Sequence, residues 1–231
     1  MPERWNEAYA ERVDIYVRFE RFYHSEEGYA QLVNQRTPLG EKVVLDVGAG
    51  TGDMAVSLAR FGRKVYALEP STQMASVIVS KIKESGLSNV EVLAEGCDHI
   101  SLPDSSVDVA TASHSLGCTD RLRCLREIER VVVDGGQICA FENWAFQDNT
   151  FQSMREPESV EYDKAFVKFM TEQGFAVSEV IKAYWDFPSV QEAVQVMGFL
   201  LGRKAKHYIT SKRIRRIDNR VCLLLKTIRK L

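Results

Sequence analysis

The chain has 231 residues, of which 45% are hydrophobic and 27% charged. This is ordinary for a globular protein and excludes a disordered chain, a collagen-like chain and a disulfide scaffold. No apolar run approaches the ~18 residues of a membrane span, and the first residues lack the layout of a signal peptide. We therefore expect a protein without a membrane span, large enough for one domain or two small ones.

The five cysteines are odd in number, and no two form a Cys-x-x-Cys pair. This pattern favours reduced thiols in a cytoplasmic protein over disulfides or a zinc site, and we expect no metal. The cysteines are Cys97, Cys118, Cys124, Cys139 and Cys222.

The net charge of −2 conceals a strong asymmetry. Residues 203–231 hold eleven Lys or Arg and one Asp, a local charge of +10, whereas residues 37–202 carry −10. A basic segment of this kind could meet nucleic acid, an anionic substrate or an acidic partner surface. The simpler interpretation is a solvated face, or a surface that docks on the acidic body or on a second subunit.

Residues 3–35 are expected to be helical, because aromatic and aliphatic residues recur there at helical spacing. After a breaker at 37–40, strands and helices alternate, which predicts a parallel, doubly wound sheet. The expected strands are 43–47, 65–68, 90–94, 107–112 and 137–142. The expected helices are 53–61, 71–85, with Ser71 as N-cap and Gly86 beyond its end, and 120–133.

After Trp144 the pattern is looser. We expect a loop over 146–158, a helix over 159–173, an extended segment over 175–187, a helix over 189–201 and a last strand over 220–227. The layout predicts one structural domain overall, of α/β class, with a mostly parallel seven-stranded sheet. Residues 1–36 would form a helical N-terminal cap, residues 37–231 the main domain, and about 146–206 the roof of its pocket.

A glycine-rich turn, Leu45-Asp46-Val47-Gly48-Ala49-Gly50-Thr51-Gly52, joins the first of these strands to its helix. Such glycines allow a sharp turn and close approach of a ligand. The third glycine of a dinucleotide fingerprint would fall at position 53. That residue is Asp53, which would repel a pyrophosphate at the helix N-terminus. The turn therefore favours a ligand with ribose and adenine but no phosphate there; the alternative is a tight turn with no ligand.

Glu69 ends the second expected strand, about twenty residues after the glycine turn. A carboxylate at this position can accept hydrogen bonds from both ribose hydroxyls. Alone, it could equally be a solvated charge at a strand end; beside the glycine turn, the ribose role is favoured.

Segment 43–142 resembles the core of class I S-adenosylmethionine-dependent methyltransferases, close to the broad group that includes ubiquinone/menaquinone and other small-molecule methyltransferases. The matching motifs occur in the family's order, at 44–52, 69–74, 96–98, 102–108 and 125–136. The resemblance implies a Rossmann-like fold and S-adenosyl-L-methionine as cofactor. It says almost nothing about the methyl acceptor.

The resemblance also implies cofactor contacts at particular residues. Asp46 would reach the methionine amino group through water, and the backbone of Gly48, Ala49 and Gly50 would line the methionine and ribose. Glu69 would hold the ribose. The remaining expected contacts are Pro70 and Met74 beside the adenine, Cys97 and Asp98 at the adenine edge, and Ser113. Met74 would be helix core in the alternative interpretation.

Methyl transfer from a sulfonium needs positioning more than a catalytic group, and a base only if the acceptor arrives protonated. His114, at the end of the fourth expected strand, is the candidate base, and Glu142 could contact the acceptor. His114 could also be an ordinary loop residue. The sequence thus predicts methylation of a small molecule, with two alternatives: an RNA-modifying methyltransferase that uses the basic C-terminal segment, and a cofactor-binding protein without catalysis.

Overall fold

The computed structural model describes residues 3–117 and 120–230. Contacts divide the chain into two compact units. Unit 1 contains Met1–Glu26 and Glu142–Leu223, and unit 2 contains Glu27–Phe141 and Leu224–Leu231. Cys118, one of the cysteines expected to be reduced, lies outside the described residues.

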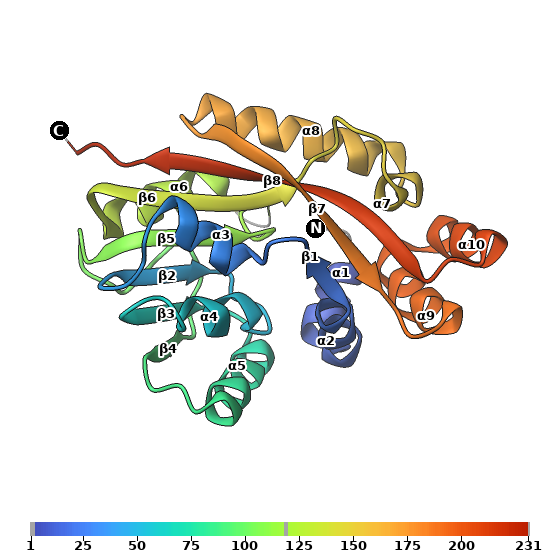
Figure 1. The fold of residues 1–231 in the computed structure, drawn as a ribbon, viewed down its shortest axis with the longest axis horizontal. Helices are drawn as coiled ribbons and strands as arrows, with labels where there is room; N and C mark the ends of the chain where they lie inside the picture. Colours follow the sequence, from blue (N-terminus) through green and yellow to red (C-terminus); the bar gives the residue numbers. More distant parts are fainter. Residues whose placement is uncertain (1–2, 118–119, 231) are drawn as a thin grey trace. The chain divides into compact units, whose positions relative to one another are not determined.

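Unit 2 contains the predicted alternation of strands and helices. Its strands are β2 (Val43–Val47), β3 (Lys64–Leu68), β4 (Val90–Leu93), β5 (Val107–Ser113) and most of β6 (Val132–Asn143). Its helices are α3 (Tyr29–Arg36), α4 (Asp53–Leu58), α5 (Thr72–Ser85) and α6 (Arg121–Val131). Figure 1 shows α3 and α4 in front of the sheet and α6 behind it, so both faces of the strands are covered.

The strands of unit 2 pair in parallel, β4 with β3, β3 with β2, β2 with β5 and β5 with β6. The last strand, β8 (Arg216–Thr227), runs beside β6. Gly135 N–H donates to Ile228 O (3.0 Å) and Trp144 N–H donates to Arg220 O (2.8 Å). Partner numbers fall along β8 as they rise along β6, so this pair is antiparallel.

Local sequence signals account for the helix ends in unit 2. The Ser71 hydroxyl accepts from Met74 N–H at the start of α5, and Gly86 ends the helix at φ 64°. Both were predicted, since serine suits an N-cap and glycine tolerates the left-handed region. Asp120 caps α6 in the same way by accepting from Arg123 N–H.

Unit 1 contains helices from both ends of its sequence and an antiparallel strand pair. Its helices are α1 (Glu3–Ala10), α2 (Val13–Arg21), α7 (Thr150–Ser153), α8 (Pro157–Glu172), α9 (Val190–Leu201) and α10 (Arg203–Lys212). Its strands are β1 (Tyr23–Ser25), β7 (Ala176–Asp186) and residues 216–223 of β8. The core is rich in aromatic rings: Trp185 contacts Phe19, Tyr23 and Phe151, with ring centroids 4.8–5.0 Å apart.

The fold class is as predicted, but the strand count is not. The sheet has eight strands in the order β1-β7-β8-β6-β5-β2-β3-β4, not seven. The eighth is β1, a three-residue strand that interrupts the helix expected over 3–35 and pairs with β7. Such a short strand depends on its partner and has no alternating pattern of its own. Helix α10 was also not predicted, and β6 begins at Val132, inside the expected helix 120–133.

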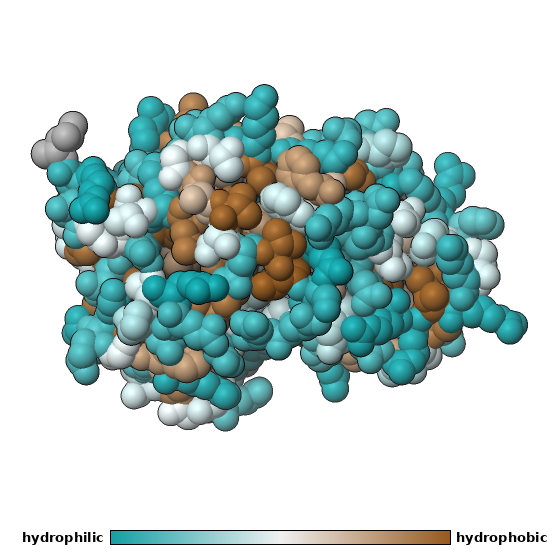
Figure 2. Space-filling model, turned by 45° about the horizontal axis from the view of Figure 1, so that its top comes forward, coloured by the Kyte–Doolittle hydropathy of each residue, from teal (hydrophilic) through white to brown (hydrophobic). Residues whose placement is uncertain are grey.

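The described residues contain no helix that is both long and apolar enough to cross a membrane. Figure 2 shows a mostly hydrophilic face on which hydrophobic side chains also gather. The division predicted from sequence, a cap over 1–36 and a domain over 37–231, stays a prediction; the contact units change at Glu26 instead.

Candidate functional site

The predicted cofactor residues of unit 2 lie on segments that follow the carboxyl ends of parallel strands. Gly48–Gly50 follow β2, Glu69 and Pro70 follow β3, Cys97 and Asp98 come after β4, and Ser113 ends β5. Because these strands are parallel, their carboxyl ends share one edge of the sheet, where open α/β sheets bind ligands.

The glycine turn has the backbone that its sequence predicts. Gly48, Gly50 and Gly52 have φ of 66°, 56° and 83°, in the left-handed region that favours glycine. A Cβ on Gly48 would lie 2.5 Å from the Cβ of Ser115. The turn therefore requires glycine at position 48 for both conformation and space.

Glu69 joins the glycine turn to the end of β3. It is buried, with its Oε2 accepting from Gly50 N–H and its Oε1 from Ser71 N–H, both at 2.8 Å. Burial raises its pKa, and the two N–H donors partly offset this. The carboxylate thus orders the turn, and each oxygen keeps acceptor capacity beyond these bonds.

Asp46 is a buried acid at the centre of the sheet. Its Oδ1 accepts from the Thr111 hydroxyl at 2.9 Å, whereas its buried Oδ2 has no hydrogen-bond partner among the described residues. Burial raises its pKa to about 7; the Thr111 bond and, more weakly, the nearby backbone N–H of Ala55 oppose the rise, and Glu69 adds to it. A buried acceptor without a donor suits a cationic ligand group, so Asp46 fits the ammonium of the expected cofactor.

Helix α4 begins with an acidic residue, Asp53. Asp53 Oδ2 accepts from the Thr51 hydroxyl at 2.6 Å and pairs with Lys81 Nζ at 2.5 Å. Negative charge here complements the helix N-terminus and disfavours a phosphate at the same place. This arrangement agrees with the sequence argument against a dinucleotide.

The two residues expected beside the adenine differ in exposure. Pro70 is exposed, whereas Met74 is wholly buried in α5. The structure does not test the role of either residue.

At the expected adenine edge, the segment after β4 is held against α6. Cys97 and Asp98 are half-buried, and Arg123 Nε donates to Asp98 O at 3.0 Å. The sulfur atoms of Cys97 and Cys124 lie 2.7 Å apart.

The candidate base follows β5 directly. His114 is exposed and has φ 54°, an uncommon conformation for a residue with a side chain. The backbone N–H of His114 donates to the backbone carbonyl of Phe141 at 2.9 Å. Ser113 before it is half-buried and pairs with Phe141. Backbone strain of this kind is frequent at functional sites.

Glu142, the other predicted catalytic residue, belongs to unit 1. It is buried, and its backbone carbonyl accepts from Cys222 Sγ at 3.5 Å. Burial, with a contribution from Glu142, raises the pKa of Cys222 to about 12.

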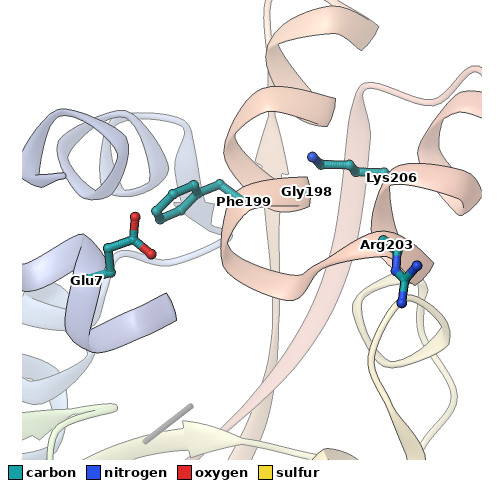
Figure 3. A pocket seen from close by; sticks show the side chains of 5 residues that line it. All are labelled: Glu7, Gly198, Phe199, Arg203 and Lys206. Atoms are coloured by element: carbon teal, nitrogen blue, oxygen red, sulfur yellow. The ribbon is translucent and has the colours of Figure 1, made fainter. Parts of the chain in front are cut away.

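Unit 1 also contains a small cavity of about 140 Å³ between α1, α9 and α10. Figure 3 shows Phe199 of α9 pointing toward Glu7 of α1, with Arg203 and Lys206 on α10. No predicted site residue lines this cavity.

The basic C-terminal segment is partly neutralised within the chain. Arg215 pairs with Asp186, Arg216 with Asp218 at 3.1 Å, and Lys226 with Glu129 at 2.6 Å. Val221–Leu224 are fully buried in β8, within the strand expected over 220–227. These pairs leave less free positive charge for RNA than the count of Lys and Arg suggests.

Thr111 and Ser115 were not predicted as site residues. Thr111 bonds to Asp46, and the Ser115 hydroxyl donates to Val47 O at 2.6 Å, beside Gly48. Threonine in a buried strand was one available signal, because its hydroxyl needs a partner there. Among residues 3–117 and 120–230, no group of three or more His, Cys, Asp or Glu could hold a metal ion.

Comparison with known proteins finds similarity over the segment that contains most of these predicted site residues. Residues 45–140 match the model of a methyltransferase domain. Demethylmenaquinone methyltransferase of Bacillus velezensis is 30% identical over 156 residues, which are 65% of this chain and 62% of that enzyme. The chain therefore aligns with less than two thirds of that relative's length.

Solved structures share the fold. The YcgJ protein of Bacillus subtilis superposes with a TM-score of 0.61 at 14% identity, over 87% of this chain and 97% of that one. A SAM-dependent methyltransferase of Aquifex aeolicus gives 0.56 at 21% identity, over 86% and 90%. At these identities the superpositions demonstrate a common architecture.

Proposed function

We propose that this chain is a class I S-adenosylmethionine-dependent methyltransferase of the quinone-methyltransferase-like group and that it methylates a small-molecule acceptor; the domain match over residues 45–140 and the similarity to demethylmenaquinone methyltransferase support this. The observation that carries the proposal is the pairing of a glycine turn with two buried carboxylates, Asp46 and Glu69. The names of relatives support the acceptor class, since the Bacillus velezensis enzyme acts on demethylmenaquinone by its name.

The cofactor supplies a methyl group already activated on a sulfonium. In our proposal, Asp46 Oδ2 accepts from the cofactor's ammonium and the backbone of Gly48–Gly50 lines its methionine and ribose. Glu69 accepts from the ribose hydroxyls while it keeps its bonds to Gly50 and Ser71. Pro70, Met74, Cys97, Asp98 and Ser113 complete the proposed contacts.

His114 is proposed as the base for an acceptor that arrives protonated, and Glu142 as an acceptor contact. The strained backbone of His114, directly after β5, supports the first assignment. Replacing His114 by Asn should lower kcat by ~10²–10⁴-fold if it removes the acceptor's proton. It should leave the binding of S-adenosylhomocysteine unchanged, which separates catalysis from cofactor binding.

We also propose that the protein works in the cytoplasm. Cys139 and Cys222 support this: both are buried, and neither forms a disulfide.

The decisive experiment is calorimetric titration with S-adenosylhomocysteine, with NAD as the comparator. We expect binding of S-adenosylhomocysteine only. Glu69→Gln should weaken it by ~1–3 kcal/mol, because the amide nitrogen cannot accept the bonds that the carboxylate accepts. Glu84→Gln, at an exposed position of α5, is the matched control.

An analogue that lacks one ribose hydroxyl tests the role of Glu69 itself. The analogue should bind the natural chain more weakly than S-adenosylhomocysteine does, and the two should bind Glu69→Gln almost equally. If the variant still discriminates between them, Glu69 orders the turn without holding the ribose. Preference for NAD would refute the cofactor assignment altogether.

Once the cofactor is established, methyl transfer from labelled S-adenosylmethionine is measured on a panel of quinols, sterols and RNA. Label in a small molecule supports the proposal. Label in RNA, lost when Arg213 and Arg220 are neutralised, would favour an RNA-modifying enzyme. Tight cofactor binding without any labelled product would favour a non-catalytic binding protein.

A further inference from the structure

Two cysteines from different segments of unit 2 meet beside the sheet. Cys97 follows β4, Cys124 lies in the first turn of α6, and their sulfur atoms are 2.7 Å apart. A disulfide bond is about 2.05 Å long, so a further approach of roughly 0.7 Å would join them. Cys139 and Cys222, the other described cysteines, are buried free thiols.

Hydrogen bonds between α6 and the residues that follow Cys97 keep the two segments together. Arg123 Nε donates to Asp98 O at 3.0 Å, and Ile100 N–H donates to Glu127 Oε2 at 3.0 Å. Arg130 Nη2 donates to Ile100 O at 2.7 Å. The contact between the sulfur atoms is therefore built into the docking of this segment on α6.

Accessibility favours Cys97 as the thiol that an oxidant reaches first. It is half-buried, whereas Cys124, Cys139 and Cys222 are buried. Burial raises the pKa of Cys139 and of Cys222 to about 12. Since the thiolate is the reactive form, these two thiols should be inert at neutral pH.

We propose that Cys97 and Cys124 are a redox-active pair that peroxide converts to a reversible disulfide. The Cys97 thiolate attacks one oxygen of hydrogen peroxide, the O–O bond breaks, and hydroxide leaves to give a sulfenic acid. The Cys124 thiolate then attacks the Cys97 sulfur and displaces its hydroxide. Two thiols and one peroxide become one disulfide and two waters, and a dithiol reductant reverses the change.

The bond would tie the segment that carries Cys97 and Asp98 to α6. In the proposed function, that segment is the adenine edge of the cofactor site, so the oxidation site adjoins it. The disulfide itself does not depend on that assignment, and it is tested without cofactor.

The test exposes the full-length chain to hydrogen peroxide, blocks the remaining thiols by alkylation and maps the digested peptides by mass spectrometry. We expect a Cys97–Cys124 bond that dithiothreitol removes. No Lys or Arg lies between residues 84 and 120, so trypsin leaves Cys97 and Cys118 on one peptide. The mapping is therefore repeated on the Cys118→Ser variant, which should still form the bond.

Variants separate the two steps. Cys97→Ser should abolish the bond, whereas Cys124→Ser should leave Cys97 as a sulfenic acid that dimedone traps. Cys139→Ser is the matched control and should behave like the natural chain; thermal denaturation confirms that each variant folds. Persistence of two free thiols at 97 and 124 under peroxide would overturn the proposal, as would a bond from either residue to Cys118. Failure of S-adenosylhomocysteine to bind the reduced chain would instead overturn the proposed function.

Discussion

The Thr111 hydroxyl donates to Asp46 Oδ1 at 2.9 Å, and the two residues are register partners on β5 and β2. The bond satisfies one oxygen of a buried carboxyl and leaves the other without a donor. The sheet thus holds an acid with a pKa of about 7 where its ordinary value is 3.8. We expect that acid to make stability sensitive to pH and, if it holds the cofactor as proposed, cofactor affinity as well.

Asp46 should make the cofactor-free protein less stable as pH rises. The unfolded chain loses this proton near pH 4, whereas the folded chain keeps it until about pH 7. Between these values the folded state binds more protons, so the free energy of unfolding falls with rising pH. At about 1.4 kcal/mol per pKa unit, a shift from 3.8 to about 7 makes the cost above pH 7 on the order of 4 kcal/mol.

Asp46→Asn removes that titration. Relative to the natural chain, the variant should gain stability on going from pH 4 to pH 8, as measured by urea denaturation. Any pH-independent effect of the amide on the free energy of unfolding is the same at pH 4 and pH 8, so it cancels when the two pH values are compared. A difference between variant and natural chain that does not change with pH would contradict the assignment.

Removing the Thr111 hydroxyl should shift cofactor binding toward higher pH. The Thr111 bond lowers the pKa of Asp46, so Thr111→Val should raise that pKa and leave less carboxylate to accept the ammonium at pH 7. Calorimetry with S-adenosylhomocysteine at pH 6, 7 and 8 should show several-fold weaker binding at pH 7, recovering toward pH 8. Thr111→Ser keeps the hydroxyl and should follow the natural profile.

Gly48→Ala should destabilise the chain more than the same change at a glycine of similar conformation. Gly86 has φ 64° and open space around it, whereas a Cβ on Gly48 meets Ser115 at 2.5 Å. Gly86→Ala should cost ~1–2 kcal/mol for the left-handed backbone alone. Gly48→Ala should cost a further ~1–3 kcal/mol for overpacking.

The double variant with Ser115→Gly tests the cause of that difference, because it removes the atom that the new methyl meets. Urea denaturation should show part of the added cost recovered. Equal costs for Gly48→Ala and Gly86→Ala would mean that the turn adapts without strain.

Bound cofactor should shield Cys97. If the adenine lies against Cys97 and Asp98, saturating S-adenosylhomocysteine should slow alkylation of Cys97 at least several-fold in the reduced chain. Alkylation of the exposed thiol of an added peptide corrects for changes in reagent. An unchanged rate, with binding verified by calorimetry, would place the adenine elsewhere.

A buried ion pair should contribute strongly to the stability of unit 1. Arg155 pairs with Asp163 through two nitrogens, and their side chains are 12% and 9% exposed. Asp163→Ala would leave the guanidinium buried without its carboxylate, at a cost of ~3–5 kcal/mol in urea denaturation. Asp218→Ala breaks an exposed pair with Arg216 and should change the free energy of unfolding far less, because solvent screens such pairs.

Much of unit 2 was predictable because its signals are local. The apolar runs of β2 and β3, the Ser71 cap and Gly86 each act within a few residues. The glycine turn could be predicted in the same way, since its glycines adopt the left-handed backbone that their spacing suggested.

The features that were not predicted depend on residues that are distant in the sequence. β1 is a strand only because Tyr23–Ser25 pair with Ala183–Trp185. The role of Ser115 beside Gly48 and the contact between Cys97 and Cys124 likewise require the folded chain. No periodicity or motif in a single sequence marks such contacts.

The division into units has a practical consequence for fragments of this protein. The chain crosses between the units after Glu26, Phe141 and Leu223, so neither unit is a continuous stretch of sequence. A fragment that ends with the family match near residue 140 would lack Ile228, whose backbone bonds to Gly135 and Gly136 of β6. That strand would then expose unpaired backbone groups, which invite association with other chains. Expression of the cofactor-binding segment alone should therefore yield aggregates, and a fragment supplied with residues 224–231 as a separate peptide would be the one to try.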